Sequence, residues 1–219
     1  MEIAAREFES KNNDILRHLH ELQEIILKVG VVLEGNCFYY HQSLNLFPEL
    51  LAKQVNLFAC GRYATSRICE IGFNAGHSSM LLLLGRENTP IDFTVFDIGH
   101  YSYTKPCMEY IKSQFSHANF EYIEGDSTVT MPEFISKHNE LMGTYDVIHV
   151  DGGHTEHCIS NDMRNTDLLI RVGGIVIIDD TNDYDINRYV DMYISTGNYE
   201  EKQIFKTVGY PHRVIQKIR

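Results

Sequence analysis

The chain has 219 residues, a length that suits one domain of ordinary size, or one domain with an appended helical segment. Hydrophobic residues make up 43% and charged residues 22%, which excludes a disordered chain, and no apolar run approaches the roughly 20 residues that span a bilayer. The net charge of −11 comes without any basic run, so we expect no nucleic-acid partner.

The cysteines and the first residues indicate the compartment. The five cysteines are odd in number and show no CxxC or zinc spacing, so we expect reduced thiols. The opening Met-Glu-Ile-Ala-Ala-Arg-Glu lacks the layout of a secretory signal. Together these features predict a cytoplasmic protein without a membrane partner.

The N-terminal part of the chain has a helical pattern. In residues 3–30 the apolar positions, among them Ile15, Leu19 and Leu22, recur near helical spacing with charged residues between them. This pattern predicts one amphipathic helix or two.

A second helical stretch runs from about residue 46 to residue 60, with Pro48 in its first turn, where proline is tolerated. We therefore expect a helical cap over residues 1–64 and a sheet-containing domain over residues 65–219.

The stretch from Ile68 to Ser79 opens the predicted sheet. A short apolar run leads through a turn that contains Gly72 and Gly76, four positions apart, into the apolar run 80–84. This order predicts a strand, a tight glycine turn and a buried helix. Such a turn places backbone N–H groups and a helix N-terminus beside the sheet edge, where a small ligand can approach the main chain. Glycines that serve close packing alone are the alternative.

Residues Ile91 to Asp97 read as the second strand, which ends in an acid. A carboxylate at that point has two acceptor oxygens for the two hydroxyls of a ribose. Asp97 follows Gly76 by 21 residues, close to the roughly 20 typical of that role. The alternative is a solvated acid at a strand end.

A helix over 104–116 and a strand over 120–124 follow, and the strand ends in the turn Gly-Asp-Ser. Asp126 in this turn precedes a helix and therefore suits an N-cap. A ligand contact by Asp126 is compatible with the same turn.

A buried strand over 145–151 ends in Asp151 and leads through Gly-Gly-His into a helix over 159–171. The next apolar strand, 175–181, carries two acids near its end. Strand, helix and strand fit a right-handed parallel unit, so both acidic ends should lie at one edge.

The tail predicts a helix over 183–196 and two strands over 199–205 and 212–218, joined by a short Gly-Tyr-Pro segment. Two such runs form a hairpin. The predicted fold class is α/β, with a mostly parallel sheet closed by an antiparallel C-terminal hairpin.

The acids Asp151, Asp179 and Asp180 should converge where ligands bind in open α/β sheets. Like charges at a partly desolvated site raise a pKa or recruit a cation, and oxygen ligands favour a hard divalent ion, Mg²⁺ first. The alternatives are a solvated acidic rim, or a rim neutralised by Arg188 or Lys53.

The pattern Glu-x-Gly-x-x-x-Gly after a strand resembles the cofactor loop of class I S-adenosylmethionine-dependent methyltransferases. The resemblance implies a Rossmann-like sheet with an N-terminal helical preface and a loop that wraps the methionine part of S-adenosylmethionine, with its acid near the amino group. It also places an acid of the Gly-Asp-Ser turn at the adenine. The implied cofactor-binding residues are Glu70, Gly72, Asn74, Gly76, Ser78, Asp97, Asp126 and Ser127.

Asp-Gly-Gly-His followed by Ile-Asp-Asp-Thr resembles the metal-dependent O-methyltransferases of the catechol and caffeoyl-CoA type and of the macrocin and cephalosporin type. By this resemblance Asp151, Asp179 and Asp180 are metal ligands. The catechol type has a lysine where this chain has His154, as in the antibiotic-sugar branch. His154 is our candidate base because histidine accepts a proton near neutral pH. A histidine that simply bonds the backbone at a helix start is the alternative.

These features predict methyl transfer to a hydroxyl of a small molecule, with Mg²⁺ orienting and acidifying the acceptor. A metal-free methyltransferase acting on nitrogen or on a peptide, and a noncatalytic cofactor-binding subunit, are the competing functions. Residues of the helical cap could line the substrate pocket, or could serve surface packing or a homodimer contact. These residues are Tyr39, Tyr40, His41 and Gln42.

Overall fold

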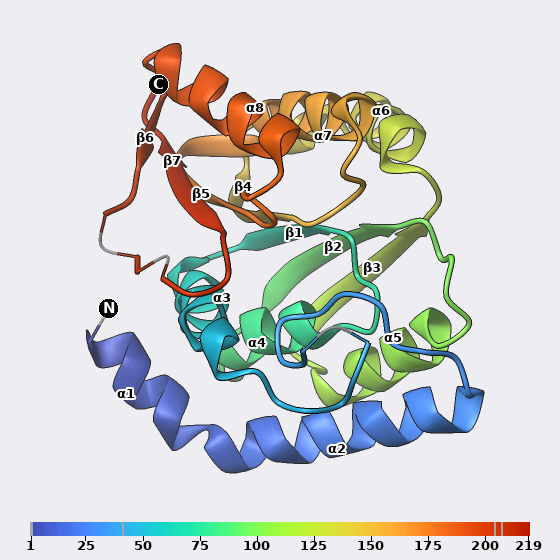
Figure 1. Ribbon diagram of the computed structural model, residues 1–219. Helices are drawn as coiled ribbons and strands as arrows, with labels where there is room; N and C mark the ends of the chain where they lie inside the picture. Colours follow the sequence, from blue (N-terminus) through green and yellow to red (C-terminus); the bar gives the residue numbers. More distant parts are fainter. Residues whose placement is uncertain (1, 41, 204, 207) are drawn as a thin grey trace.

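The computed structural model describes residues 2–40, 42–203, 205–206 and 208–219 (Figure 1). Three α-helices come first, strands and α-helices then alternate, and two successive strands come last. The helices are α1 (Glu2–Ser10), α2 (Asn12–Val29), α3 (Leu51–Tyr63), α4 (His77–Gly85), α5 (Thr104–Gln114), α6 (Ser127–Lys137), α7 (Glu156–Leu169) and α8 (Tyr184–Ser195). The strands are β1 (Arg67–Ile71), β2 (Ile91–Asp97), β3 (Ala118–Glu124), β4 (Tyr145–Val150), β5 (Ile170–Ile178), β6 (Tyr199–Glu201) and β7 (Arg213–Lys217).

The described strands form one sheet in the order β3-β2-β1-β4-β5-β7-β6. The first five are parallel, whereas β7 runs antiparallel to both β5 and β6. The order reverses between β1 and β4, and at such a point an open α/β sheet forms a crevice at the carboxyl ends of its strands. The predicted Rossmann-like sheet with an antiparallel C-terminal hairpin is confirmed.

Helices cover both faces of the sheet. In Figure 1, α4 and α5 lie on one face together with the N-terminal helices, and α6, α7 and α8 lie on the other. Alternate residues of β5 supply the two cores: Ile175 and Ile177 belong to the first hydrophobic cluster, Val176 and Ile178 to the second. This is the period of two expected of a strand that is buried on both sides.

The N-terminal helices share the core of the sheet. Buried side chains of α1 and α2, among them Phe8 and Leu22, belong to the same cluster as Phe93 of β2. Helix α3 packs closely on α4, because a Cβ at Gly61 would lie 2.0 Å from the carbonyl oxygen of Leu82. The predicted boundary after residue 64 falls between α3 and β1, and the division into two domains stays a prediction.

Several predicted element bounds differ in the structure, among them that of the second helical stretch, which is a short 3-10 helix over Pro48–Leu50 followed by α3. Helix α7 begins at Glu156 rather than at residue 159, because Thr155 caps it by accepting a hydrogen bond from the Cys158 backbone N–H at 3.2 Å. Strand β5 already begins at Ile170, within the predicted end of that helix. Strand β6 ends at Glu201, whereas the predicted strand extends to residue 205. Residue 204 lies outside the described residues.

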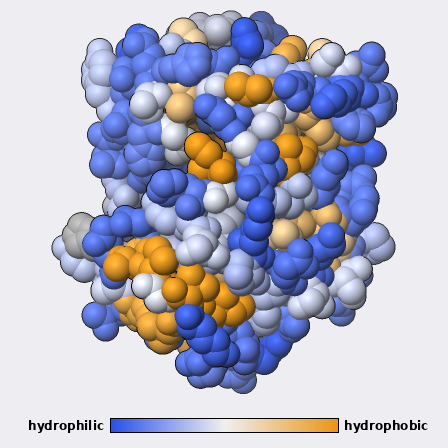
Figure 2. Space-filling view, turned by 90° about the vertical axis from the view of Figure 1, so that its right-hand side faces the viewer, coloured by the Kyte–Doolittle hydropathy of each residue, from blue (hydrophilic) through white to orange (hydrophobic). Residues whose placement is uncertain are grey.

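Figure 2 shows the face that lies to the right in Figure 1. It is mostly hydrophilic, with its largest group of hydrophobic side chains towards the lower left and smaller groups nearer the centre and the top. Within the described parts of the chain, no helix combines the length and the apolar character needed to cross a membrane.

Candidate functional site

The carboxyl ends of the central strands border a cavity of about 410 Å³. Most of the predicted site residues line it, although they come from five separate loops. These are Gly72, Asn74, Ser78, Asp97, Asp126, Ser127, Asp151, His154, Asp179 and Asp180. Glu70 and Gly76 are not among the lining residues.

The two glycines of the loop after β1 are needed by the backbone itself. Gly72 has φ +91°, and a Cβ there would lie 2.0 Å from the carbonyl oxygen of Asp151. Gly76 has φ +77°, and its Cβ would lie 2.5 Å from the Phe73 ring. Close packing therefore accounts for both glycines, and Gly72 still borders the cavity.

Asp97 ties the glycine loop to the end of β2. Its Oδ2 accepts hydrogen bonds from the backbone N–H groups of Phe73 at 2.7 Å and Asn74 at 2.8 Å, and its Oδ1 accepts one from Gly99 at 2.7 Å. A carboxylate has about four acceptor positions, so one remains for a ligand after these three bonds. Asp97 is thus more than a solvated acid, because it also positions the loop.

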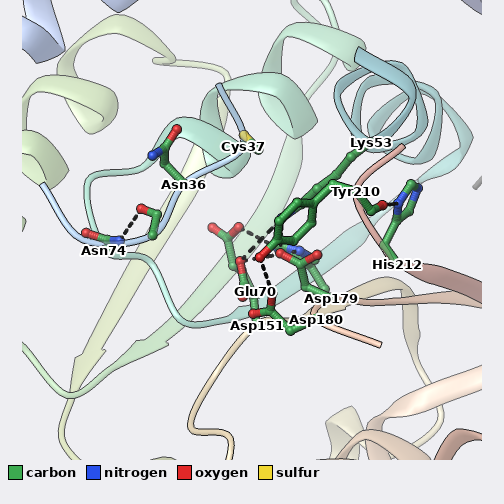
Figure 3. A network of polar contacts seen from close by, with 12 residues as sticks. Asn36, Cys37, Lys53, Glu70, Asn74, Asp151, Asp179, Asp180, Tyr210 and His212 are labelled. Carbon is green, nitrogen blue, oxygen red and sulfur yellow. Dashed lines mark hydrogen bonds and ion pairs between the residues drawn. The ribbon is translucent and has the colours of Figure 1, made fainter. Parts of the chain in front are cut away.

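The segment after α2 forms a wall of the cavity that the sequence did not reveal. Asn74 donates through Nδ2 to the carbonyl oxygen of Gly35 at 2.7 Å and accepts at Oδ1 from the Tyr103 hydroxyl at 2.7 Å. These bonds bring residues 34–37 over the glycine loop, where they line the cavity (Figure 3). The only signal was the break in helical pattern at Gly35.

The expected lining residues of the helical cap lie elsewhere. Tyr39, Tyr40 and Gln42 are not among the residues that line the cavity, and His41 lies outside the described residues. Tyr39 is 5% exposed and its ring packs edge-on against His77.

Glu70 is fully buried in β1. Its carboxylate accepts a hydrogen bond from the Ser79 hydroxyl and lies 2.9 Å from Nδ1 of His149, its register partner on β4. Both oxygens therefore have partners inside the protein. A contact between Glu70 and a cofactor amino group stays a prediction.

Asp126 is the N-cap of α6, one of its two predicted roles. Its Oδ1 accepts from the Thr128 backbone N–H at 2.9 Å and from the Thr128 hydroxyl at 2.7 Å, and these bonds lower the pKa of Asp126. Asp126 and Ser127 also line the cavity, so the cap leaves a ligand contact open.

Within the described chain, one residue that lines the cavity has a buried ring nitrogen without a partner. His77, in the first turn of α4, lines the cavity and is 3% exposed, and its Nε2 has no partner among the residues that the structure describes. Burial lowers the pKa of His77 to about 4, so the ring is neutral. With six carboxylates and one lysine among the residues that line the cavity, the lining suits a small polar ligand that carries positive charge.

The predicted metal ligands meet at the ends of β4 and β5, together with a lysine (Figure 3). Lys53 of α3 is 2% exposed, and its ammonium is ion-paired with Asp179. The same nitrogen lies 4.0 Å from Oδ2 of Asp151. Of the two cations named as neutralising alternatives, Lys53 reaches the acids, whereas Arg188 pairs with Glu156 at 2.6 Å.

Asp180 binds two other groups. It accepts a hydrogen bond from the Tyr210 hydroxyl at 2.8 Å, and its Oδ2 lies 2.9 Å from Nε2 of His154. Burial opposes ionisation of Asp180, but these bonds outweigh it and lower its pKa. The bond to Asp180 raises the pKa of His154 above its ordinary value, and the imidazole is half-exposed at the cavity.

The three predicted ligands do not form one compact set. Among the described residues, the groups with ligand atoms within 4.8 Å of one another are His149, Asp151 and Asp179, and Asp151, His154 and Asp180. In the first group the Lys53 ammonium is bonded to Oδ2 of Asp179, while Oδ1 of Asp179 and Nε2 of His149 have no hydrogen-bond partner among the described residues. In the second group His154 and Tyr210 use the oxygens of Asp180. A Mg²⁺ ion held by all three aspartates therefore fits this arrangement poorly.

A family model described as a methyltransferase domain matches residues 69–181. The comparison with curated proteins finds no match.

Three solved structures illustrate the likeness in fold. The O-methyltransferase from Bacillus cereus in complex with SAH is 16% identical, covering 93% of this chain and 91% of that one, with a TM-score of 0.61. TomG from Streptomyces achromogenes, an O-methyltransferase involved in tomaymycin synthesis and solved with SAM, is 13% identical over 92% and 90%, with a TM-score of 0.60. CalS11, a TDP-rhamnose 3'-O-methyltransferase of calicheamicin biosynthesis, is 14% identical over 78% and 80%, with a TM-score of 0.62.

Proposed function

Because the chain belongs to the methyltransferase domain family, we propose that it transfers a methyl group from S-adenosylmethionine to a hydroxyl of a small molecule. The family makes it an S-adenosylmethionine-dependent methyltransferase. Oxygen as the acceptor atom and a small molecule as the substrate are the proposed part. Solved structures that resemble it in fold include several O-methyltransferases, which supports this choice.

One observation carries the proposal: a single cavity is lined both by the glycine loop with Asp97 and by the His154–Asp180 pair. Its volume of about 410 Å³ lies in the range of small-molecule sites. A cofactor bound at the loop and an acceptor beside His154 would share one space, which is the condition for direct transfer between them.

Residues at the ends of β2 and β3 would bind two different parts of the cofactor, the ribose and the adenine. Asp97 has one acceptor position left for a ribose hydroxyl, and Asp126 and Ser127, which line the same cavity, would meet the adenine. S-adenosylmethionine supplies an electrophilic methyl group on a positively charged sulfur. The acidic lining favours that charge.

His154 would take the proton of the acceptor hydroxyl. In the neutral ring, Nε2 donates to Asp180, which leaves Nδ1 as the accepting nitrogen. Asp180 fixes the orientation of the ring and stabilises the imidazolium that forms. Because the ring is half-exposed, the proton can pass to water afterwards. This route needs no covalent enzyme intermediate.

The competing assignments stay open to test. Mg²⁺ held by Asp151, Asp179 and Asp180 stays a prediction, and no step above depends on it. A metal-free transfer to nitrogen or to a peptide, and a noncatalytic cofactor-binding subunit, are the other functions. The His154–Asp180 pair favours a hydroxyl, because an alcohol must lose a proton to become a good nucleophile.

Methyl-labelled S-adenosylmethionine and a panel of phenols, sugars and other small alcohols test the proposal. We expect label on a hydroxyl, and we expect His154→Gln to slow turnover by about tenfold or more while affinity for S-adenosylhomocysteine stays nearly unchanged. His157→Gln is the matched control, because His157 lies in α7 and is not among the residues that line the cavity. Label on amines alone would contradict the acceptor, and cofactor binding without any transfer would favour a noncatalytic subunit.

A further inference from the structure

Lys53 brings a positive charge to the acidic edge from the N-terminal part of the chain. It lies in the first turn of α3, whereas Asp151 and Asp179 follow β4 and β5. The ammonium is ion-paired with Asp179, lies 4.0 Å from Asp151 Oδ2, and lies 5.6 Å from the centre of the Tyr210 ring. Figure 3 shows the lysine side chain reaching from its helix towards the aspartates. Lys53 also lines the cavity.

The Lys53 ammonium lies beside the carboxylates that a bound divalent cation would need as ligands. A divalent ion shared by Asp151 and Asp179 would lie beside the Lys53 ammonium, where the two positive charges repel each other in surroundings that exclude most water. The side chain is 2% exposed, so it cannot simply turn into solvent without moving α3 or the residues above it. The lysine and such an ion therefore exclude each other.

The ammonium has capacity beyond its ion pair. It carries three N–H donors, and one is bonded to Asp179. Because Lys53 lines the cavity, an oxygen of a bound acceptor can approach the remaining donors. A fixed positive charge beside an oxygen that is losing its proton stabilises the negative charge that develops there.

We propose that Lys53 takes the place of the divalent cation at this edge and stabilises the acceptor oxygen as its proton leaves for His154. The first half of this proposal, that Lys53 replaces the cation, concerns only the chain's own charges. The second half rests on the proposed methyl transfer to a hydroxyl and makes Lys53 a catalytic residue. The methyl transfer then runs without a metal ion.

Titration of the full chain with Mn²⁺, followed by calorimetry and by the electron paramagnetic resonance of free Mn²⁺, tests the first half without any acceptor. We expect the unmodified protein to bind Mn²⁺ no more tightly than about 1 mM, and Lys53→Met to bind it about tenfold or more tightly. Adding Asp151→Asn to Lys53→Met should remove the gain. Lys105→Ala is the matched control, because this exposed lysine pairs with Glu124 at the end of β3, away from the aspartates.

Micromolar binding of one Mn²⁺ by the unmodified protein, lost in Asp151→Asn or His154→Gln, would overturn the inference. A folded Lys53→Met that binds Mn²⁺ no better than the unmodified protein would overturn it as well. Circular dichroism checks the fold. If Lys53→Met does not fold, Lys53→Gln, whose polar amide has no charge and comes nearest to lysine in length, takes its place under the same criteria.

The second half of the proposal, that Lys53 stabilises the acceptor oxygen, can be tested by turnover measurements once an acceptor is known. Turnover by the unmodified protein should survive EDTA, whereas Lys53→Met should lose about tenfold or more in kcat. Turnover that EDTA abolishes would contradict the inference. Because the Mn²⁺ titration needs no substrate, its result stays readable even if the chain methylates no hydroxyl.

Discussion

At the scale of the residue, Gly72 holds two loops of the site together by having no side chain. The loop after β1 passes so close to the loop after β4 that a Cβ at Gly72 would lie 2.0 Å from the Asp151 carbonyl oxygen. The backbone there is also left-handed, with φ +91°. The same glycine thus sets the distance between the cofactor loop and the acidic edge.

Gly72→Ala should therefore lower both stability and cofactor affinity. We expect a loss of roughly 2–4 kcal/mol in the free energy of unfolding, because the added methyl group forces the two loops apart. Gly143→Ala is the control: its φ is +64°, but nothing lies within 4 Å of its Cβ, so only the backbone penalty of about 1 kcal/mol applies. Urea unfolding measures both. Equal losses in the two variants would show that the close contact is unimportant.

Single residues also show where sequence reasoning stops. Asp97, Asp151, Asp179 and Asp180 could be placed at one edge because each follows a predicted parallel strand. Lys53 could only be named as an alternative, since its approach depends on how α3 packs against the sheet. That packing is set by tertiary contacts such as Gly61 on α4, which have no local signal.

At the scale of the element, Asp146 joins β4, β5 and the start of β1 below the site. This buried carboxylate accepts hydrogen bonds from Arg171 at 2.7 Å and from the backbone N–H groups of Thr65, Ser66 and Arg67 at 2.6–3.0 Å. Burial alone would raise the pKa of Asp146, but these bonds outweigh it and hold the pKa well below its ordinary value. The carboxylate is therefore needed in its charged form.

Asp146→Asn should cost about 3 kcal/mol in the free energy of unfolding, because it leaves Arg171 and one or more N–H groups without their charged partner. Glu133→Gln is the control. That residue pairs with Lys137 on the exposed face of α6, and its loss should cost less than about 0.5 kcal/mol. Chemical denaturation measures the free energy of unfolding of both variants. A loss in Asp146→Asn as small as that in the control would show that the hydrogen bonds of Asp146 contribute little to stability.

Elements with a strong pattern were predicted well, and their cross-strand partners were not. The five parallel strands and the hairpin followed from apolar runs and turn residues. The pairing of Glu70 with His149 depends on the register of β1 against β4, which aligns these two positions. Without that register, Glu70 could be judged only by the motif it resembles, and its buried partners remained hidden.

At the scale of the whole molecule, two buried histidines link the fold to pH. Burial lowers the pKa of His18, between α2 and α5, and of His77, beside the cavity, to about 4 each from an ordinary value of 6.5. The nearby Arg17 adds to the effect at His18, whose Nδ1 lies 2.8 Å from the Tyr110 hydroxyl. Both rings are therefore neutral in the folded protein near pH 6.

Stability should then fall on mild acidification. The unfolded chain takes up protons below pH 6.5 that the folded chain does not bind until about pH 4, so the free energy of unfolding decreases across this window, by roughly 2–3 kcal/mol per histidine. Above pH 6.5 this contribution is fully present. Denaturation curves from pH 7 to pH 4 measure the slope. His18→Gln should lower this slope by the amount that corresponds to one proton taken up on unfolding. An unchanged slope would show that His18 does not contribute to the pH dependence.

The molecule as a whole is organised around the reversal of strand order between β1 and β4, which opens the crevice that the N-terminal segment then covers. The parallel order could be predicted from the alternation of strands and helices. The cover formed by residues 34–37 could not, because it rests on side-chain bonds of Asn74 to a turn far away in the chain.

Calorimetry with S-adenosylhomocysteine tests the central claim, a cofactor bound in the cavity against the glycine loop and Asp97, most directly. We predict that the unmodified protein binds one molecule and that Asp97→Asn weakens the affinity about tenfold or more, because a ribose acceptor and a loop anchor are both impaired. Asp92→Asn, at the opposite end of the same strand, should leave the affinity unchanged. The proposed cofactor site would be contradicted if the unmodified protein did not bind S-adenosylhomocysteine. It would also be contradicted if Asp97→Asn bound S-adenosylhomocysteine as tightly as the unmodified protein does.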